Sequence, residues 1–157
     1  MNGCTNDTMS LRGAGVVTIA QPVKGHRFTL DSILLADFCR IKPKDRVLEP
    51  GAGTGVISLL LAKKHLGAAF TAVEVQPQLA ALCEQNMIDN SLEGRTTVVA
   101  RDLRRLNGKL TRGSFSVIVA NPPYIKKDAG RSSPHAARQI ARHDQEASLP
   151  SWLNLHC

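Results

Sequence analysis

The chain has 157 residues, enough for one domain with a hydrophobic core, and its hydrophobic content of 43% fits a globular protein. Its longest apolar run, residues 56–62, is too short to span a bilayer, so no membrane partner is expected. Residues 1–10 lack the pattern of a signal peptide, and the four cysteines are scattered without a C-x-x-C pair. We therefore expect a cytoplasmic protein with no metal site, preceded by a disordered tail over residues 1–10.

The formal net charge of +7 is concentrated in two basic clusters, over residues 101–113 and 125–143. Such clusters favour a polyanionic partner such as RNA, although a solvated surface without a partner explains them equally well. The candidate RNA-binding residues all belong to the second cluster: Lys126, Lys127, Arg131, Arg138 and Arg142.

Residues 11–20 are typical of a short strand or hairpin, and residues 32–40 of a helix with Asp31 as its N-cap. A polar linker then leads into alternating strands and helices. The pattern predicts strands at 46–49, 69–75, 96–100 and 115–120, and helices at 55–65 and from Pro77 to residue 89. This alternation predicts an α/β fold with a parallel sheet and right-handed crossovers.

The stretch RVLEPGAGTG, residues 46–55, joins a strand to a helix and carries Gly51, Gly53 and Gly55. Glycines let a ligand approach the backbone, and a helix that follows points its first N–H groups at that ligand. The dinucleotide fingerprint G-x-G-x-x-G would need a glycine where Val56 stands. The spacing E-x-G-x-G-x-G, which begins at Glu49, instead resembles the first motif of class I S-adenosylmethionine (SAM) methyltransferases. A glycine-rich turn without a ligand remains the alternative.

Polar residues follow each predicted strand, and the carboxyl ends of parallel strands meet at one edge. Glu74 closes the second strand at 74 − 55 = 19 residues past the last glycine, where an acid that holds a ribose is expected. Asp102 follows the third strand. The candidate cofactor-binding residues are Glu49, Gly51, Ala52, Gly53, Thr54, Gly55, Glu74, Val75 and Asp102.

The fourth predicted strand runs into Asn121, Pro122, Pro123 and Tyr124. In this place NPPY resembles the catalytic motif of methyltransferases that modify planar nitrogens. The Asn121 side-chain oxygen and the Pro122 carbonyl are expected to accept the two N–H groups of an exocyclic amine and so stabilise its developing positive charge. Pro123 stiffens the backbone, and Tyr124 offers a ring for the base.

A wider resemblance covers the chain from Gln21 to about Leu153. GHRFTLDSILLADF at 25–38, EPGAGTG at 49–55 and NPPYIKKDAGRSSPHAARQIARHD at 121–144 are together similar to the bacterial tRNA adenine-N6 methyltransferase family. The resemblance implies a Rossmann-like class I fold with strand order 3-2-1-4 and helices on both faces, methylation of adenine N6 in tRNA, and SAM as cofactor. It also implies that Arg27 and Thr29 belong to a segment folding over SAM.

Two alternatives remain open. NPPY also occurs in release-factor glutamine methyltransferases, and the chain could be a non-catalytic SAM- or RNA-binding fragment. The resemblance implies further strands after the fourth, so residues 46–157 are expected to form an incomplete methyltransferase domain behind an N-terminal segment at 11–45. A homodimer through the exposed fourth strand or the C-terminal segment would cover that edge.

Overall fold

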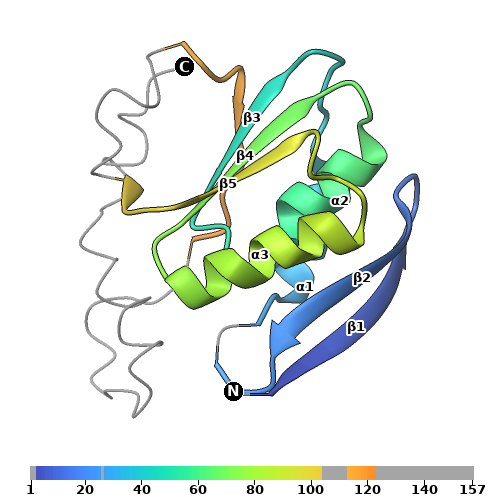
Figure 1. Cartoon of the computed structure of the whole chain (residues 1–157). Helices are drawn as coiled ribbons and strands as arrows, with labels where there is room; N and C mark the ends of the chain where they lie inside the picture. The colour runs from blue at the N-terminus through green and yellow to red at the C-terminus, as the bar shows by residue number, and fades with distance from the viewer. Residues whose placement is uncertain (1–2, 26, 104–112, 123–157) are drawn as a thin grey trace, which may run out of the picture.

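The structure is a computed structural model that describes residues 3–25, 27–103 and 113–122. Figure 1 shows three layers in this part: a parallel sheet, a layer of helices and an N-terminal hairpin. Within the described residues no helix is both long and apolar enough to cross a membrane.

The hairpin consists of β1 (Cys4–Leu11) and β2 (Gly15–Pro22), which pair antiparallel from Leu11 opposite Gly15 to Cys4 opposite Pro22. The prediction of a disordered tail is therefore wrong from Cys4 onwards. β1 is polar, but its backbone pairs with β2, whose Val17 and Ile19 are buried in the core. Pairing and tertiary packing here override a weak local propensity.

The parallel sheet has the order β5-β4-β3-β6, which confirms the predicted order 3-2-1-4. Its strands are β3 (Arg46–Pro50), β4 (Ala69–Glu74), β5 (Thr96–Ala100) and β6 (Val117–Ile118). β6 is shorter than the predicted strand at 115–120. Hydrogen bonds to β3 nevertheless continue on either side of it, from Ser116 N–H to the Arg46 carbonyl and from Val119 N–H to the Leu48 carbonyl.

The helices are α1 (Leu30–Phe38), α2 (Val56–Lys64) and α3 (Pro77–Asp89). α1 begins two residues earlier than predicted, with Thr29 as its N-cap. The prediction of Asp31 as N-cap is wrong: its carboxylate lies in the first helical turn, where it complements the helix dipole. α3 begins at Pro77 as predicted, because proline fits the first position of a helix.

The three helices lie between the sheet and the hairpin, on one face of the sheet (Figure 1). Val47, Phe70 and Ala72 face this layer and join the main core, together with most of α2. Leu48 and Val73 point to the other face, where a smaller cluster includes Val99, Leu103, Phe115 and Ile118. This alternation is that of strands buried on both faces.

Candidate functional site

The turn between β3 and α2 has the glycine conformations that the sequence predicted. Gly51, Gly53 and Gly55 adopt φ of 66°, 58° and 80°, values that side chains with a Cβ rarely tolerate. The Ala52 N–H donates to the Val73 carbonyl at 3.0 Å, which ties the turn to β4. Ala52 and Thr54 are both buried. The turn is therefore a fixed backbone feature at the carboxyl edge of the sheet.

Glu49 lies in β3 just before this turn and is almost completely buried. Its Oε2 accepts the Ser58 N–H at 2.8 Å, in the first turn of α2. The N-cap of α2 is Gly55, which has no side chain to satisfy that N–H, so Glu49 performs the capping from the strand. Burial raises the pKa of Glu49 to about 7; hydrogen bonding to Ser58 lowers it, and the nearby charge of Glu74 adds to the rise.

Glu74 ends β4 and holds the glycine turn from the other side. Its Oε2 accepts the Gly53 N–H at 2.8 Å, and its Oε1 accepts the Gln76 N–H at 2.9 Å. Each carboxylate oxygen offers about two acceptor positions, so both retain capacity for a ligand hydroxyl. Glu74 therefore shapes the turn and stands where a ribose would be held.

Asn121 follows β6 at the same edge. Ile118 pairs with Leu48 in the register of the sheet, so the chain leaves β6 beside the glycine turn. The Asn121 Nδ2 donates to the Oγ of Ser32, a buried residue of α1, at 3.0 Å. This contact uses the amide nitrogen and leaves the Oδ1 oxygen of Asn121 as an acceptor.

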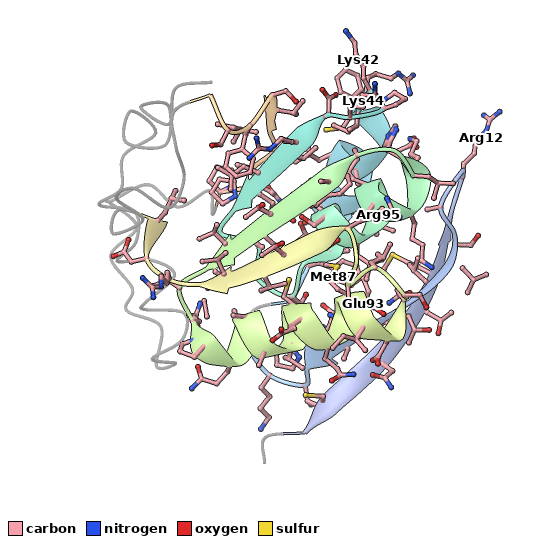
Figure 2. The ribbon with its side chains drawn as sticks, turned by 45° about the horizontal axis from the view of Figure 1, so that its top comes forward. Arg12, Lys42, Lys44, Met87, Glu93 and Arg95 are labelled. Atoms are coloured by element: carbon pink, nitrogen blue, oxygen red, sulfur yellow. The ribbon has the colours of Figure 1, made fainter. Side chains whose placement is uncertain are left out.

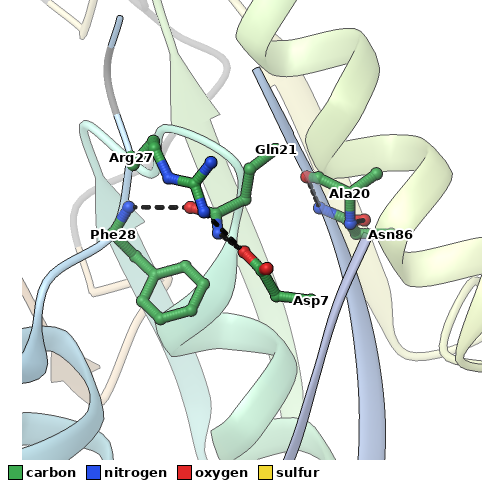
Figure 3. A network of polar contacts seen from close by, with 6 residues as sticks. All are labelled: Asp7, Ala20, Gln21, Arg27, Phe28 and Asn86. Atoms are coloured by element: carbon green, nitrogen blue, oxygen red, sulfur yellow. Dashed lines mark hydrogen bonds and ion pairs between the residues drawn. The ribbon is translucent and has the colours of Figure 1, made fainter. Parts of the chain in front are cut away.

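The structure places Arg27 in a network on the hairpin and brings it to no residue of the glycine turn by a described contact (Figure 3). Its guanidinium pairs with the Asp7 carboxylate at 2.8 Å, and Gln21 donates to the same carboxylate. The Gln21 Oε1 accepts the Phe28 N–H at 3.0 Å. The hairpin thus fixes the segment that the resemblance placed over the cofactor, while Thr29 is exposed as the α1 N-cap.

The remaining predicted residues divide into two groups. Val75, Asp102 and Pro122 lie after β4, β5 and β6 and are half-buried, so the strands do bring them to the predicted edge. The others lie outside the described residues: Pro123, Tyr124, Lys126, Lys127, Arg131, Arg138 and Arg142.

Sequence reasoning missed Ser32, Gln21 and Asn86, which all use their side chains to hold the site together. Asn86 is the one that the sequence signalled. It lies three residues after Cys83 and seven after Leu79, so it falls within the apolar face of α3. A buried asparagine in a helix needs partners for its amide. Its side chain bonds to Ala20 of the hairpin and to Thr54 of the glycine turn.

Comparison with known proteins agrees with this geometry. Residues 25–147 match the model of the family described as "Methyltransferase small domain". The chain belongs to this methyltransferase family. In a protein of this family the glycine turn, the acids and the NPPY motif are parts of one methyl-transfer site, and their meeting at a single sheet edge is accounted for.

Relatives and solved structures give the same picture of the methyltransferase. A protein of Tolumonas auensis named "tRNA1(Val) (adenine(37)-N6)-methyltransferase" is 32% identical over 130 residues, which cover 80% of this chain and 52% of the relative. A protein of Haemophilus influenzae with the same name is 29% identical, over 81% of this chain and 53% of the relative. The chain thus spans about half the length of these curated relatives.

Two crystal structures show the same fold. One is the P. horikoshii TYW2 in complex with MeSAdo, with a TM-score of 0.54, 22% identity, and coverage of 67% of this chain and 38% of that one. The other is a SAM-dependent methyltransferase from Agrobacterium tumefaciens, with a TM-score of 0.53, 21% identity, and coverage of 75% and 40%. The α/β class I architecture predicted from the sequence is confirmed.

Proposed function

We propose that this chain binds SAM at the glycine turn and methylates the exocyclic N6 of an adenine in tRNA. The observation that carries the proposal is the Asn121 amide, which Ser32 holds at the edge where the glycine turn meets Glu74. The names of the relatives support adenine in tRNA as the acceptor.

The residues at the turn fit this cofactor chemically. SAM carries a sulfonium and an ammonium group, and the turn is flanked by the carboxyl groups of Glu49 and Glu74. Opposite charges attract strongly where water is excluded. Three glycines with positive φ leave backbone open to a ligand. Glu74 would hold the ribose and the turn would line the cofactor. When bound, the cofactor supplies an electrophilic methyl group.

The protein's own contribution to transfer is orientation of the acceptor. An exocyclic amine conjugated to a ring is a poor nucleophile because its lone pair is delocalised. The Asn121 Oδ1 and the Pro122 carbonyl would each accept one N–H, which directs the lone pair away from the ring and stabilises the positive charge on nitrogen. Ser32 keeps the Asn121 amide from rotating, so this acceptor is positioned before the base arrives.

Binding and transfer are tested separately, because the chain spans about half of its relatives. Calorimetry should detect SAM binding in the micromolar range and a clear preference for SAM over NADH. A transfer assay with methyl-labelled SAM and total tRNA then compares wild type with Asn121→Ala. The variant should lose transfer and keep its SAM affinity. Preference for NADH would overturn the cofactor, and equal loss of SAM affinity in the variant would overturn the role of Asn121.

The tRNA contact is proposed to involve the basic residues after Tyr124, in the cytoplasm where tRNA is found. Replacing Lys126 and Lys127 by glutamine should weaken tRNA binding and reduce its salt dependence, by a slope of about 0.7 to 0.9 per lost phosphate contact. The matched control removes two charges from Lys42 and Lys44. These exposed residues precede β3, at the end of the sheet opposite the site (Figure 2). Equal losses from both pairs would show a general charge effect and no localised contact.

Self-association is proposed at β6, which pairs on one side with β3 and forms the edge of the described sheet. A second copy added there would continue the ladder and cover its unpaired backbone groups. Light scattering that shows a monomer at high protein concentration would contradict this.

A further inference from the structure

α3 presents two buried asparagines, Asn86 and Asn90, to the edge of β2. The Asn86 Oδ1 accepts the Ala20 N–H at 2.7 Å, and its Nδ2 donates to the Ala20 carbonyl at 3.1 Å. Asn90 pairs in the same way with Thr18, accepting its N–H at 3.2 Å and donating to its carbonyl at 2.7 Å. Each amide therefore replaces one residue of a neighbouring strand.

The spacing of the two asparagines explains why a helix can do this. Four residues of helix rise about 6 Å, and two residues of strand advance about 6.8 Å. Side chains at i and i+4 consequently meet alternate residues of β2, which are those that point their N–H and carbonyl groups to the same edge. α3 thereby forms hydrogen bonds along one edge of β2, while β1 pairs with the other.

Asn86 has a second connection that Asn90 lacks. Its Nδ2 also donates to the Thr54 carbonyl in the glycine turn, at 2.9 Å and in a fully buried position. The second bond of the Asn90 Nδ2 goes instead to the Asn86 carbonyl within α3, at 2.8 Å. One side-chain amide thus joins the hairpin to the turn that is proposed to bind the cofactor. Figure 3 shows Asn86 against Ala20, close to the hairpin network.

The turn also rests directly on α3 at Gly55. A Cβ at this position would lie 2.4 Å from the Cys83 Sγ and 2.8 Å from the Met87 Cε. The Gly53 N–H is held on the other side by the Glu74 carboxylate. The position of the turn is therefore set by Glu74 and by α3, and Asn86 supplies the hydrogen bond from α3.

We propose that Asn86 is a positioning residue of the cofactor site, which couples docking of the N-terminal hairpin to binding of SAM at the glycine turn. The inference rests on the proposed function, because it takes SAM as the ligand of the turn. If the hairpin separates from α3, the Asn86 amide loses two of its three bonds and its hold on the Thr54 carbonyl weakens. Linkage is reciprocal, so a bound cofactor that stabilises the turn also stabilises the docked hairpin.

The hairpin contributes to the site in a second way. Gln21 of β2 accepts the Phe28 N–H, and Asp7 of β1 pairs with Arg27. These contacts set the path of the chain into α1, whose Ser32 holds Asn121. Release of the hairpin would therefore loosen both the cofactor turn and the segment that supports the acceptor site.

The test compares Asn86→Ala with Asn90→Ala by calorimetry with SAM. Both variants lose two hydrogen bonds to β2, but only Asn86→Ala also loses the bond to the Thr54 carbonyl. SAM affinity should fall about 5- to 20-fold in Asn86→Ala and less than about twofold in Asn90→Ala, in keeping with usual coupling magnitudes. Equal SAM affinity in the two variants would overturn the positioning role.

Amide hydrogen exchange in the wild type tests the coupling without any variant. Saturating SAM should slow exchange at Ala20 and Thr18 by about threefold or more, because opening of the hairpin would then work against the bound cofactor. The slowing should disappear in Asn86→Ala. Exchange at Ala20 that SAM leaves unchanged in the wild type would overturn the coupling. A wild type that does not bind SAM would overturn the proposed function itself, which calorimetry reports separately.

Discussion

Glu49 should make the stability of the folded protein fall as the pH rises from about 4.5 to about 7. Its carboxyl group is buried at the end of β3, and burial raises its pKa from 4.5 to about 7, against the effect of hydrogen bonding to Ser58. Between these two values the folded state binds a proton that the unfolded state has released. Stability therefore decreases with increasing pH across this window and becomes constant above it.

The size of this effect follows from the same two values. Each pKa unit corresponds to about 1.4 kcal/mol, so a rise from 4.5 to about 7 represents about 3 kcal/mol in the free energy of unfolding. Most of the change, about 2 to 3 kcal/mol, falls between pH 5 and pH 8. That is a large fraction of the stability of a typical small domain.

The matched variant is Glu49→Gln, which has the same shape, keeps an acceptor for the Ser58 N–H and cannot titrate. Urea unfolding of both proteins at pH 5, 6, 7 and 8 gives the difference in their free energies of unfolding. Other titrating groups, such as Asp37 with its pKa lowered by Lys64, cancel in this difference. The variant should gain about 2 to 3 kcal/mol relative to wild type from pH 5 to pH 8. A constant difference, or a gain by the wild type, would refute a protonated Glu49.

Gly55→Ala should cost about 3 kcal/mol or more in urea unfolding, because its Cβ would clash with α3. Gly15→Ala has a similar φ but open space around it, so it should cost only about 1 kcal/mol; equal costs would contradict the clash. Glu74→Gln should weaken SAM binding about tenfold by calorimetry, since it removes a charge-assisted acceptor, and an unchanged affinity would remove Glu74 from the site. Ser32→Ala should slow methyl transfer about tenfold at constant SAM affinity, because Asn121 loses its support; a matching loss of SAM affinity would make Ser32 a structural residue.

The parallel sheet could be predicted because its signals are local. The apolar runs at β4 and β5, and the proline that begins α3, gave bounds within one residue of the observed ones. The strand order followed from right-handed crossovers between parallel strands. β6 was overestimated because an apolar run shows where a strand can form, whereas the length of a ladder depends on the partner.

The hairpin could not be predicted in full because its stability comes from distant residues. β1 contains few β-forming side chains, and its place depends on pairing with β2. β2 in turn depends on two amides of α3, which lie more than 60 residues further along the chain. Asn86 and Asn90 fit a helix pattern as polar interruptions, and the sequence alone does not identify the strand edge that they serve.

The glycines of the turn show how a correct prediction can rest on an incomplete reason. The spacing of Gly51, Gly53 and Gly55 indicated a backbone that a ligand approaches, and positive φ at all three agrees with it. For Gly55 the structure gives a further cause, because α3 occupies the place of a Cβ and faces away from any ligand at the turn's open side. Helix packing and ligand approach therefore select glycine at adjacent positions for different reasons. The motif records the fit of α3 as much as the fit of the cofactor, and a residue of α3 such as Asn86 is for that reason part of the same site.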